Sequence, residues 1–295
     1  MVKKNSKISS VAIYTSKKNK RTHEILNQLV EITENLNLNI LNPESSALKI
    51  SSKTKEVTDN SVIKNADLII AIGGDGTLLS CSRKFGIHGV PILGINLGNL
   101  GFLNDIAPDD LTNSILNILE GHFTVDKRFF LETKINNKRQ KDIALNEVVI
   151  HSGSIAQLIE YDLFINNNFV YRQKADGLIV STSTGSTAYA LSGNGPIIHP
   201  DVNAICLLPM FPHSLNTRPL MVHEDSSILV VPNKKSFISY DSHKMSSLKK
   251  GEEILIQKTK QELNLVHPLD HDFYSACRTK LGWSLGVPNK NDTSN

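Results

Sequence analysis

A five-residue turn, Gly73-Gly74-Asp75-Gly76-Thr77, constrains the possible folds of this chain more than any other feature. It follows the continuous apolar run 66–72, which is expected of a strand buried on both faces of a sheet. The segment 77–85 that follows is typical of a helix beginning at Thr77. A turn that joins a buried strand directly to a helix favours a parallel α/β sheet.

The segments around this turn repeat the same alternation. Strand-like runs occupy 11–15 and 90–96, and apolar residues recur at helical spacing between Ile25 and Ile32. The segment 107–122 has Pro and two Asp at its front and Gly behind, which is typical of a capped amphipathic helix. We therefore expect residues 1–122 to form an α/β domain with a parallel sheet.

The pattern changes after residue 122. Short strand-like runs separated by Asn, Gly, Ser and Asp follow one another, with few helical periods between them. This predicts a mostly β, sandwich-like C-terminal domain over residues 123–271. The tail 272–295 is a candidate to join the first domain.

Composition excludes several classes of protein. No apolar stretch approaches the length of a membrane span, and the N-terminus lacks the features of a signal peptide. Cys81, Cys206 and Cys277 lie far apart, which fits neither a disulfide framework nor a zinc site and indicates a cytoplasmic protein. A net charge of +3 does not indicate a nucleic acid or membrane partner.

His267 and His271 are four residues apart, but Pro268 argues against a regular helix, so no metal site is predicted there.

The glycine turn has the chemistry of a phosphate site. Glycines allow a ligand to approach the backbone, and a helix start offers free N–H groups and a positive dipole end. We therefore predict that Gly73, Gly74, Gly76 and Thr77 bind phosphate. Asp75 would be repelled there unless it accepted a proton from an attacking hydroxyl or helped to hold Mg²⁺. The simpler alternative is that Asp75 is a helix cap.

The turn resembles that of a kinase group that includes NAD kinases, 6-phosphofructokinases and diacylglycerol- or sphingosine-type lipid kinases. Residues 174–200, KADGLIVSTSTGSTAYALSGNGPIIHP, resemble the signature of NAD kinases in particular. The blocks LNEVVIH (145–151), PMFPHSLNTRPL (209–220) and CRTKLGW (277–283) are similar to further blocks of that family. The resemblance covers most of the chain from about residue 66 to residue 283.

The resemblance implies a set of ligand-binding residues. Asn146 and Glu147 would hold ribose hydroxyls, Asp176 would accept from a ribose hydroxyl or a base amine, and Tyr189 would offer a flat face to a ring. Where many members have Asp-Gly-Gln, this chain has Asp241-Ser242-His243, so His243 is expected at the glutamine contact. The residues predicted to contact NAD are Asp75, Gly76, Asn146, Glu147, Lys174, Asp176, Thr187, Ala188, Tyr189, Ala190, Leu191, Ser192 and His243.

By this resemblance the chain is expected to be an NAD kinase that phosphorylates the 2′-hydroxyl of the adenosine ribose of NAD to give NADP. Asp75 would be the catalytic base, and Mg²⁺ or another divalent cation would accompany the donor, ATP or polyphosphate. The family implies a homodimer or homotetramer. The alternatives are a lipid or sugar kinase with the same turn, and a non-catalytic dinucleotide sensor.

Overall fold

The computed structural model describes residues 8–49, 54, 56–98, 101–104, 106, 108–154 and 157–283. The chain divides into two compact units. The first contains residues 1–81, 90–125 and 265–295, and the second contains residues 82–89 and 126–264. No helix of the described ranges combines the length and the apolar character needed to cross a membrane.

The first unit is built on a parallel sheet. Its strands are β1 (Ser10–Tyr14), β2 (Asn39–Pro43), β3 (Glu56–Val57), β4 (Leu68–Ile72), β5 (Ile92–Ile95) and the end of β17 (Ile254–Pro268). They lie in the order β17-β5-β4-β1-β2-β3, and every adjacent pair is parallel. The central strand β4 is buried along its whole length, as its apolar run predicts. The predicted α/β fold class is confirmed.

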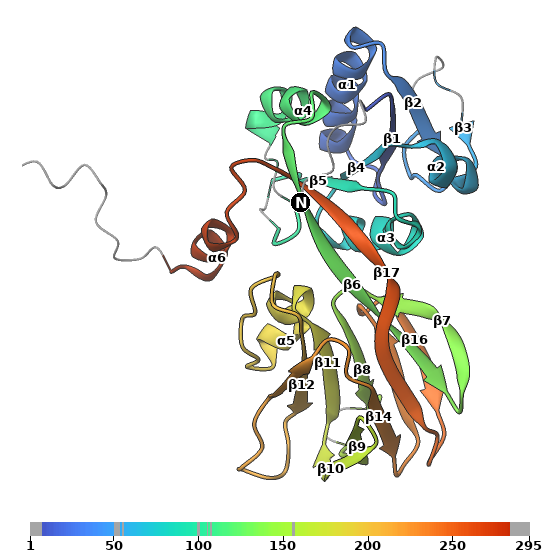
Figure 1. Ribbon diagram of the computed structural model, residues 1–295, viewed down its shortest axis with the longest axis vertical. Coiled ribbons are helices and arrows are strands. Elements are labelled where there is room, and N and C mark those ends of the chain that lie inside the picture. Colours follow the sequence, from blue (N-terminus) through green and yellow to red (C-terminus); the bar gives the residue numbers. More distant parts are fainter. Residues whose placement is uncertain are drawn as a thin grey trace, which may run out of the picture. The chain divides into compact units, whose positions relative to one another are not determined.

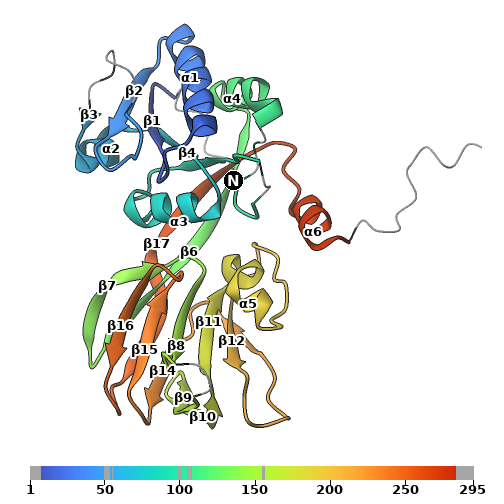
Figure 2. The same cartoon turned by 180° about the vertical axis from the view of Figure 1, so that it is seen from behind.

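Helices α1 (Lys20–Asn35) and α4 (Leu111–Leu119) pack on this sheet. The other described helices outside the β-rich part are α2 (Asp59–Asn65), α3 (Asp75–Lys84) and α6 (Phe273–Leu281), and the 3-10 helices η1 (Gly86–His88) and η2 (Pro108–Asp110). Figures 1 and 2 show α1 and α4 side by side. Their apolar residues, including Leu29 and Ile115, share one core with Ile70 of β4. Because apolar residues recur at threes and fours along α1, one of its faces is buried in this core.

Helix α3 begins earlier than the sequence predicts. The expected start was Thr77, but the helix starts at Asp75. The carbonyl oxygen of Gly74 accepts from the amides of Thr77 (2.9 Å) and Leu78 (3.3 Å), and this closes the first turn over Asp75 and Gly76. Asp75 is therefore part of the first helical turn, where backbone amides lack helical partners.

The second unit consists of two packed antiparallel sheets. One has the order β10-β9-β14-β17, with β6 paired to β17 and β7, and the other has the order β13-β12-β11-β8-β15-β16. The strands are β6 (Phe123–Ile135), β7 (Lys138–Ala144), β8 (Glu147–His151), β9 (Ile159–Ile165), β10 (Asn168–Ala175), β11 (Gly177–Thr182), β12 (Ala204–Met210), β13 (Leu220–His223), β14 (Ile228–Pro232), β15 (Ser236–Tyr240), β16 (Lys244–Leu248) and β17. The predicted mostly β domain is confirmed.

One apolar core holds the two sheets together. Val180 and Ile150 from one sheet pack in the same cluster as Leu163 and Val230 from the other. On the far face of the six-stranded sheet, Ile179 packs against Ala190 of the short helix α5 (Tyr189–Ser192). Strand β11 is buried on both faces as a result, and its end leads into the 3-10 helix η3 (Thr184–Thr187).

Paired asparagines make two of the hairpin turns. Asn136 and Asn137 join β6 to β7, and Asn166 and Asn167 join β9 to β10. All four have positive φ, between 47° and 65°. Two consecutive left-handed residues give the type I′ turn, whose twist matches that of the flanking strands, and asparagine tolerates this conformation better than most residues.

Candidate active site

Three donors hold the carboxylate of Asp75 in one orientation. The backbone amide of Phe102 donates to Oδ2 (3.2 Å), and the amide of Leu103 (3.4 Å) and Nδ2 of Asn104 (2.9 Å) donate to Oδ1. A carboxylate has about four lone-pair sites. Within the described residues, one site on Oδ2 is left to accept a proton or to contact a cation. A side chain that served only as a helix cap would be satisfied by its own helix, whereas this one is held from another segment.

The predicted phosphate-binding residues differ in what they can offer. The amide of Gly73 donates to the carbonyl of Ile95 (2.9 Å), which ties the turn to β5. Thr77 is buried, and its hydroxyl pairs with that of Ser16 (2.6 Å). Gly74 and Gly76 are exposed, with open space where a side chain would project. The accessible part of the turn is therefore Gly74 to Gly76, at the positive end of α3.

Asn146 directly precedes β8 and Glu147 is its first residue. Both are buried, with exposed fractions of 7% and 2%. Among the described residues, Oδ1 of Asn146 and Oε2 of Glu147 have no hydrogen-bond partner. Buried polar atoms without partners are rare because they lose water and gain nothing in return. A ligand with hydroxyl groups would satisfy both atoms.

The environment of Glu147 disfavours its charged form. Burial, with a further contribution from the nearby charge of Asp241, raises the pKa of Glu147 to about 8. The backbone N–H of Tyr189 donates to this carboxyl group and offsets part of the effect. Glu147 is therefore largely protonated at neutral pH, so it can donate a hydrogen bond as well as accept one.

The segment 184–192 packs directly against Asn146. A β-carbon at Gly185 would overlap the carbonyl oxygen of Asn146, so only glycine allows this approach. The hydroxyl of Ser186 donates to the carbonyl of Ser183 (2.7 Å) and accepts from the amide of Ile198 (3.0 Å). The hydroxyl of Ser186 thus stabilises the turn through hydrogen bonds to its own backbone. Other residues of the same segment are predicted to contact the ligand.

The predicted contacts within this segment are exposed to different degrees. Tyr189 is 40% exposed, whereas Ala190 is buried in the apolar cluster on the outer face of the sheet. Thr187, Ala188 and Leu191 are half-buried, and Ser192 is exposed. Ala190 can therefore reach a ligand only through its backbone.

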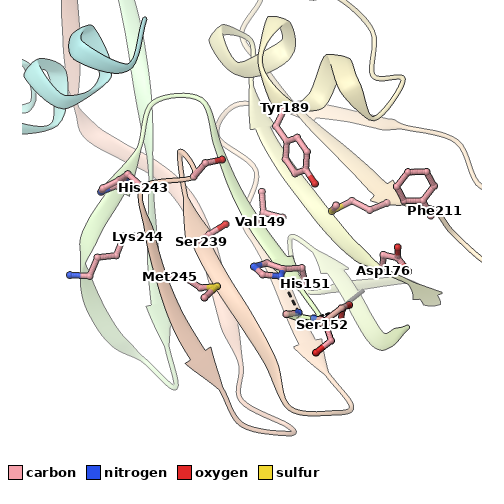
Figure 3. Close-up of a pocket in the computed structure, with 14 residues that line it drawn as sticks. Val149, His151, Ser152, Asp176, Tyr189, Phe211, Ser239, His243, Lys244 and Met245 are labelled. Carbon is pink, nitrogen blue, oxygen red and sulfur yellow. Dashed lines mark hydrogen bonds between the residues drawn. The ribbon is translucent and has the colours of Figure 1, made fainter. Parts of the chain in front are cut away.

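A cavity of about 670 Å³ lies on the second unit beside Tyr189 (Figure 3). Three of the residues predicted for NAD line it, namely Asp176, Tyr189 and His243. Its other lining residues are Val149, His151, Ser152, Gly153, Ser154, Met210, Phe211, Ser239, Ser242, Lys244 and Met245. Its mixture of aromatic, hydroxyl and imidazole groups suits a ligand that has both rings and hydroxyls.

His243 presents a defined face to this cavity. Its Nδ1 lies 2.5 Å from the carbonyl oxygen of Tyr240, so Nδ1 carries the proton and Nε2 is an acceptor when the ring is neutral. Burial, followed by the charge of Arg83, lowers the pKa of His243 below its ordinary value. The ring is therefore predominantly neutral at pH 7.

Lys174 is not among the residues that line the cavity. It lies exposed on β10, with its Nζ 3.7 Å from the carboxylate of Glu160. The structure therefore brings Asp176 to the cavity wall and leaves Lys174, two residues earlier, on the surface.

Comparison with known proteins identifies the family. Residues 4–123 match the model of the ATP-NAD kinase N-terminal domain, and residues 145–268 match that of the ATP-NAD kinase C-terminal domain. An NAD kinase of Tolumonas auensis is 39% identical over 284 residues, which are 93% of this chain and 97% of that protein. An NAD kinase of Teredinibacter turnerae is 42% identical over 257 residues, which are 85% and 88% of the two chains.

The chain belongs to the NAD kinase family.

Two solved structures share the fold. A yeast NADH kinase in complex with NADH superposes with a TM-score of 0.82 at 24% identity, covering 96% of this chain and 89% of that one. An NAD kinase from Archaeoglobus fulgidus in complex with ATP gives a TM-score of 0.71 at 24% identity, covering 92% and 97% of the two chains.

Sequence reasoning missed several residues of the site. Asn104, which holds Asp75, and Arg83, which pairs with Asp241 (2.7 Å), were not singled out. His151 was not predicted to contact the ligand either; it lines the cavity, and its Nδ1 accepts from the amide of Gly153 (3.1 Å). Single charged or amide residues outside a recognised motif carry no local signal, since their partners are distant in sequence.

Proposed function

We propose that this chain transfers the terminal phosphate of ATP to the 2′-hydroxyl of the adenosine ribose of NAD, giving NADP and ADP. The observation that carries the proposal is the pair of buried, unpartnered oxygens on Asn146 and Glu147. Neither residue lines the cavity, but the Glu147 carboxyl accepts from the backbone N–H of Tyr189, which does. Ribose hydroxyls can donate to these oxygens. Family membership supports the same substrate.

Asp75 is the proposed general base. Its carboxylate is oriented by Phe102, Leu103 and Asn104, with room on Oδ2 for one proton. The 2′-hydroxyl would give its proton to Oδ2 as its oxygen attacks the terminal phosphorus, and ADP would leave with the electron pair of the broken P–O bond. General-base assistance of this kind typically contributes about 10²- to 10⁴-fold in rate.

The first turn of α3 is the proposed phosphate site. The backbone from Gly74 to Gly76 is accessible, and the positive end of the helix dipole favours the developing negative charge. Gly73 and Thr77 would act by shaping the turn, since the amide of Gly73 and the hydroxyl of Thr77 are already hydrogen-bonded.

Mg²⁺ is proposed to accompany ATP and, when bound, to offset the charge of the transferring phosphate. Asp75 would be the protein ligand, since it keeps a lone-pair site on Oδ2. That site can contact a cation or take a proton. The donor phosphates would therefore supply most of the cation's ligands.

The remaining residues predicted for NAD are proposed to bind it in two ways. Asn146, Glu147 and Asp176 would hold hydroxyls or amines, and Tyr189 would stack on a ring. The path of the ligand along the end of η3 and along α5 would be shaped by Thr187, Ala188, Ala190, Leu191 and Ser192. Lys174 is proposed to contact the ligand only if it leaves Glu160.

Several finer features belong to the same proposal. We propose a cytoplasmic homodimer or homotetramer that uses ATP, with polyphosphate as a second donor to be tested. Light scattering at several protein concentrations measures the oligomeric state. Replacing ATP with polyphosphate in the kinase assay tests the donor.

The decisive experiment measures NADP formation. The purified protein is incubated with NAD, ATP and Mg²⁺, and NADP is detected with an NADP-specific dehydrogenase. Diacylglycerol and fructose 6-phosphate are assayed in parallel with labelled ATP. Labelled lipid or sugar without NADP would establish the alternative kinases, and NAD binding without ATP consumption would establish a sensor.

A further inference from the structure

The carboxylate of Asp241 is the centre of a buried hydrogen-bond cluster in the second unit. Its Oδ1 accepts from the amides of Asn146 (2.8 Å) and Glu147 (3.2 Å). Its Oδ2 accepts from the amide of Leu145 (3.0 Å) and from Nη1 of Arg83 (2.7 Å). Four donors use the four lone-pair sites of the carboxylate, so Asp241 has no capacity left for a ligand.

Three consecutive backbone amides converge on this one carboxylate. Amides that point in the same direction cannot belong to a regular strand, where successive amides alternate in direction. Strand β7 therefore ends at Ala144 and β8 begins at Glu147, and the short segment between them is hydrogen-bonded to the carboxylate of Asp241. The direction of the Asn146 and Glu147 side chains depends on this segment.

Arg83 neutralises the buried charge of Asp241. The side chain of Asp241 is fully buried and that of Arg83 is 15% exposed, so their pairing removes an otherwise uncompensated buried charge. The remaining charge of Asp241 contributes to the raised pKa of Glu147. Asp241 thus influences both the position and the protonation of Glu147, and Arg83 holds Asp241 in place.

We propose that Asp241 and Arg83 are positioning residues for NAD: they hold the backbone of residues 145–147 so that Oδ1 of Asn146 and Oε2 of Glu147 face the substrate. This rests on the proposed NAD kinase function. Neither residue contacts the reacting atoms. They act through Asn146 and Glu147 and therefore govern the affinity for NAD rather than that for ATP.

Two variants test the positioning role. Asp241→Asn keeps the side-chain shape and tolerates the φ of 44° at this position, but its amide nitrogen cannot accept from backbone N–H groups. It also leaves the charge of Arg83 without its partner carboxylate, and an uncompensated buried charge can prevent folding. The double variant Arg83→Gln with Asp241→Asn removes both charges together, so it leaves no such charge.

Asp162→Asn is the matched control. Asp162 accepts from Nε (2.6 Å) and Nη2 (2.8 Å) of Arg172 on β10, so this substitution also removes a carboxylate from an arginine pair in the second unit. Among the hydrogen bonds of the described residues, none joins that carboxylate to a residue predicted for NAD. The pair is more exposed than Arg83–Asp241, so the control reports the effect of losing an Asp–Arg pair away from the residues predicted for NAD, while thermal unfolding measures the cost of the buried pair.

Steady-state kinetics and thermal unfolding are measured on all four proteins. Both Asp241 variants are expected to raise the KM for NAD about 10-fold or more, since each lost charged hydrogen bond typically changes an equilibrium by about that factor. The KM for ATP should stay within about two-fold, and Asp162→Asn should leave both constants unchanged.

Two results would overturn this inference while leaving the proposed function intact. One is an unchanged KM for NAD in the folded double variant. The other is an equal rise in the KM for NAD and the KM for ATP, in proportion to the loss of thermal stability. A wild-type protein that makes no NADP would instead overturn the proposed function, and this inference with it.

Discussion

The carboxylate of Asp75 lies in the space that a side chain at Gly101 would occupy. A β-carbon built at Gly101 would overlap Oδ1 of Asp75 and lie 3.2 Å from Nδ2 of Asn104. Gly101 is buried, so no solvent-filled space lets the two groups separate. The glycine is therefore needed because of the aspartate, which is far from it in sequence.

Gly101→Ala should displace the Asp75 carboxylate from its donors. We expect kcat to fall by about 10²-fold, within the range that general-base assistance contributes, with the KM for NAD changed little. Steady-state kinetics in both substrates measure this. Gly251→Ala is the control, because it places a side chain at a φ of 76° in open space and should lower thermal stability without lowering kcat.

Asp75→Asn should keep the fold and most of the affinity for NAD. The amide cannot take the proton of the 2′-hydroxyl, so turnover should fall by at least about 10²-fold. Calorimetric NAD binding and a single-turnover assay with ATP separate the two properties. Near-normal turnover in a folded Asp75→Asn protein would remove Asp75 from the role of base.

Glu147→Gln should change how stability depends on pH. The pKa of Glu147 is about 8 in the folded protein and 4.5 in the reference state, so the folded protein binds more protons between these values. The contribution of Glu147 to the free energy of unfolding of the wild type therefore falls as pH rises from 4.5 to about 8. The glutamine variant lacks this contribution, so its stability relative to the wild type should increase across that window.

Urea unfolding of both proteins at pH 5 and pH 8 tests this sign. Each pKa unit corresponds to about 1.4 kcal/mol, so the relative change should amount to a few kcal/mol at most. An identical pH dependence in the two proteins would mean that Glu147 is ionised throughout this pH range and that its pKa is not raised by burial.

His243→Leu should weaken NAD binding. The Nδ1 proton of His243 is directed to Tyr240, so the ring offers Nε2 as an acceptor at the cavity wall. Losing one such hydrogen bond should raise the KM for NAD about 10-fold, and His243→Gln, whose amide oxygen can accept, should recover part of it. Equal KM values in the leucine and wild-type proteins would place His243 outside the site.

Much of the fold follows from local patterns. The apolar run before Gly73 predicts β4, and the short runs separated by Asn and Gly predict the β-rich unit. The start of α3 could not be predicted to the residue, because glycines carry little helical signal and the hydrogen bonds to Gly74 decide it. Nor could the sequence predict that Lys174 is exposed and Ala190 buried, because the exposure of a side chain depends on which strands and helices become neighbours.

The sequence by itself determined the family, the two kinds of sheet and the motif residues, because each of these depends on residues that are adjacent in the sequence. Only the tertiary structure decided which distant groups stabilise those motifs. Asn104 and Gly101 hold and accommodate Asp75, while Asp241 and Arg83 shape the segment that carries Asn146 and Glu147. The physical reason is that a buried carboxylate must collect hydrogen-bond donors wherever the folded chain brings them.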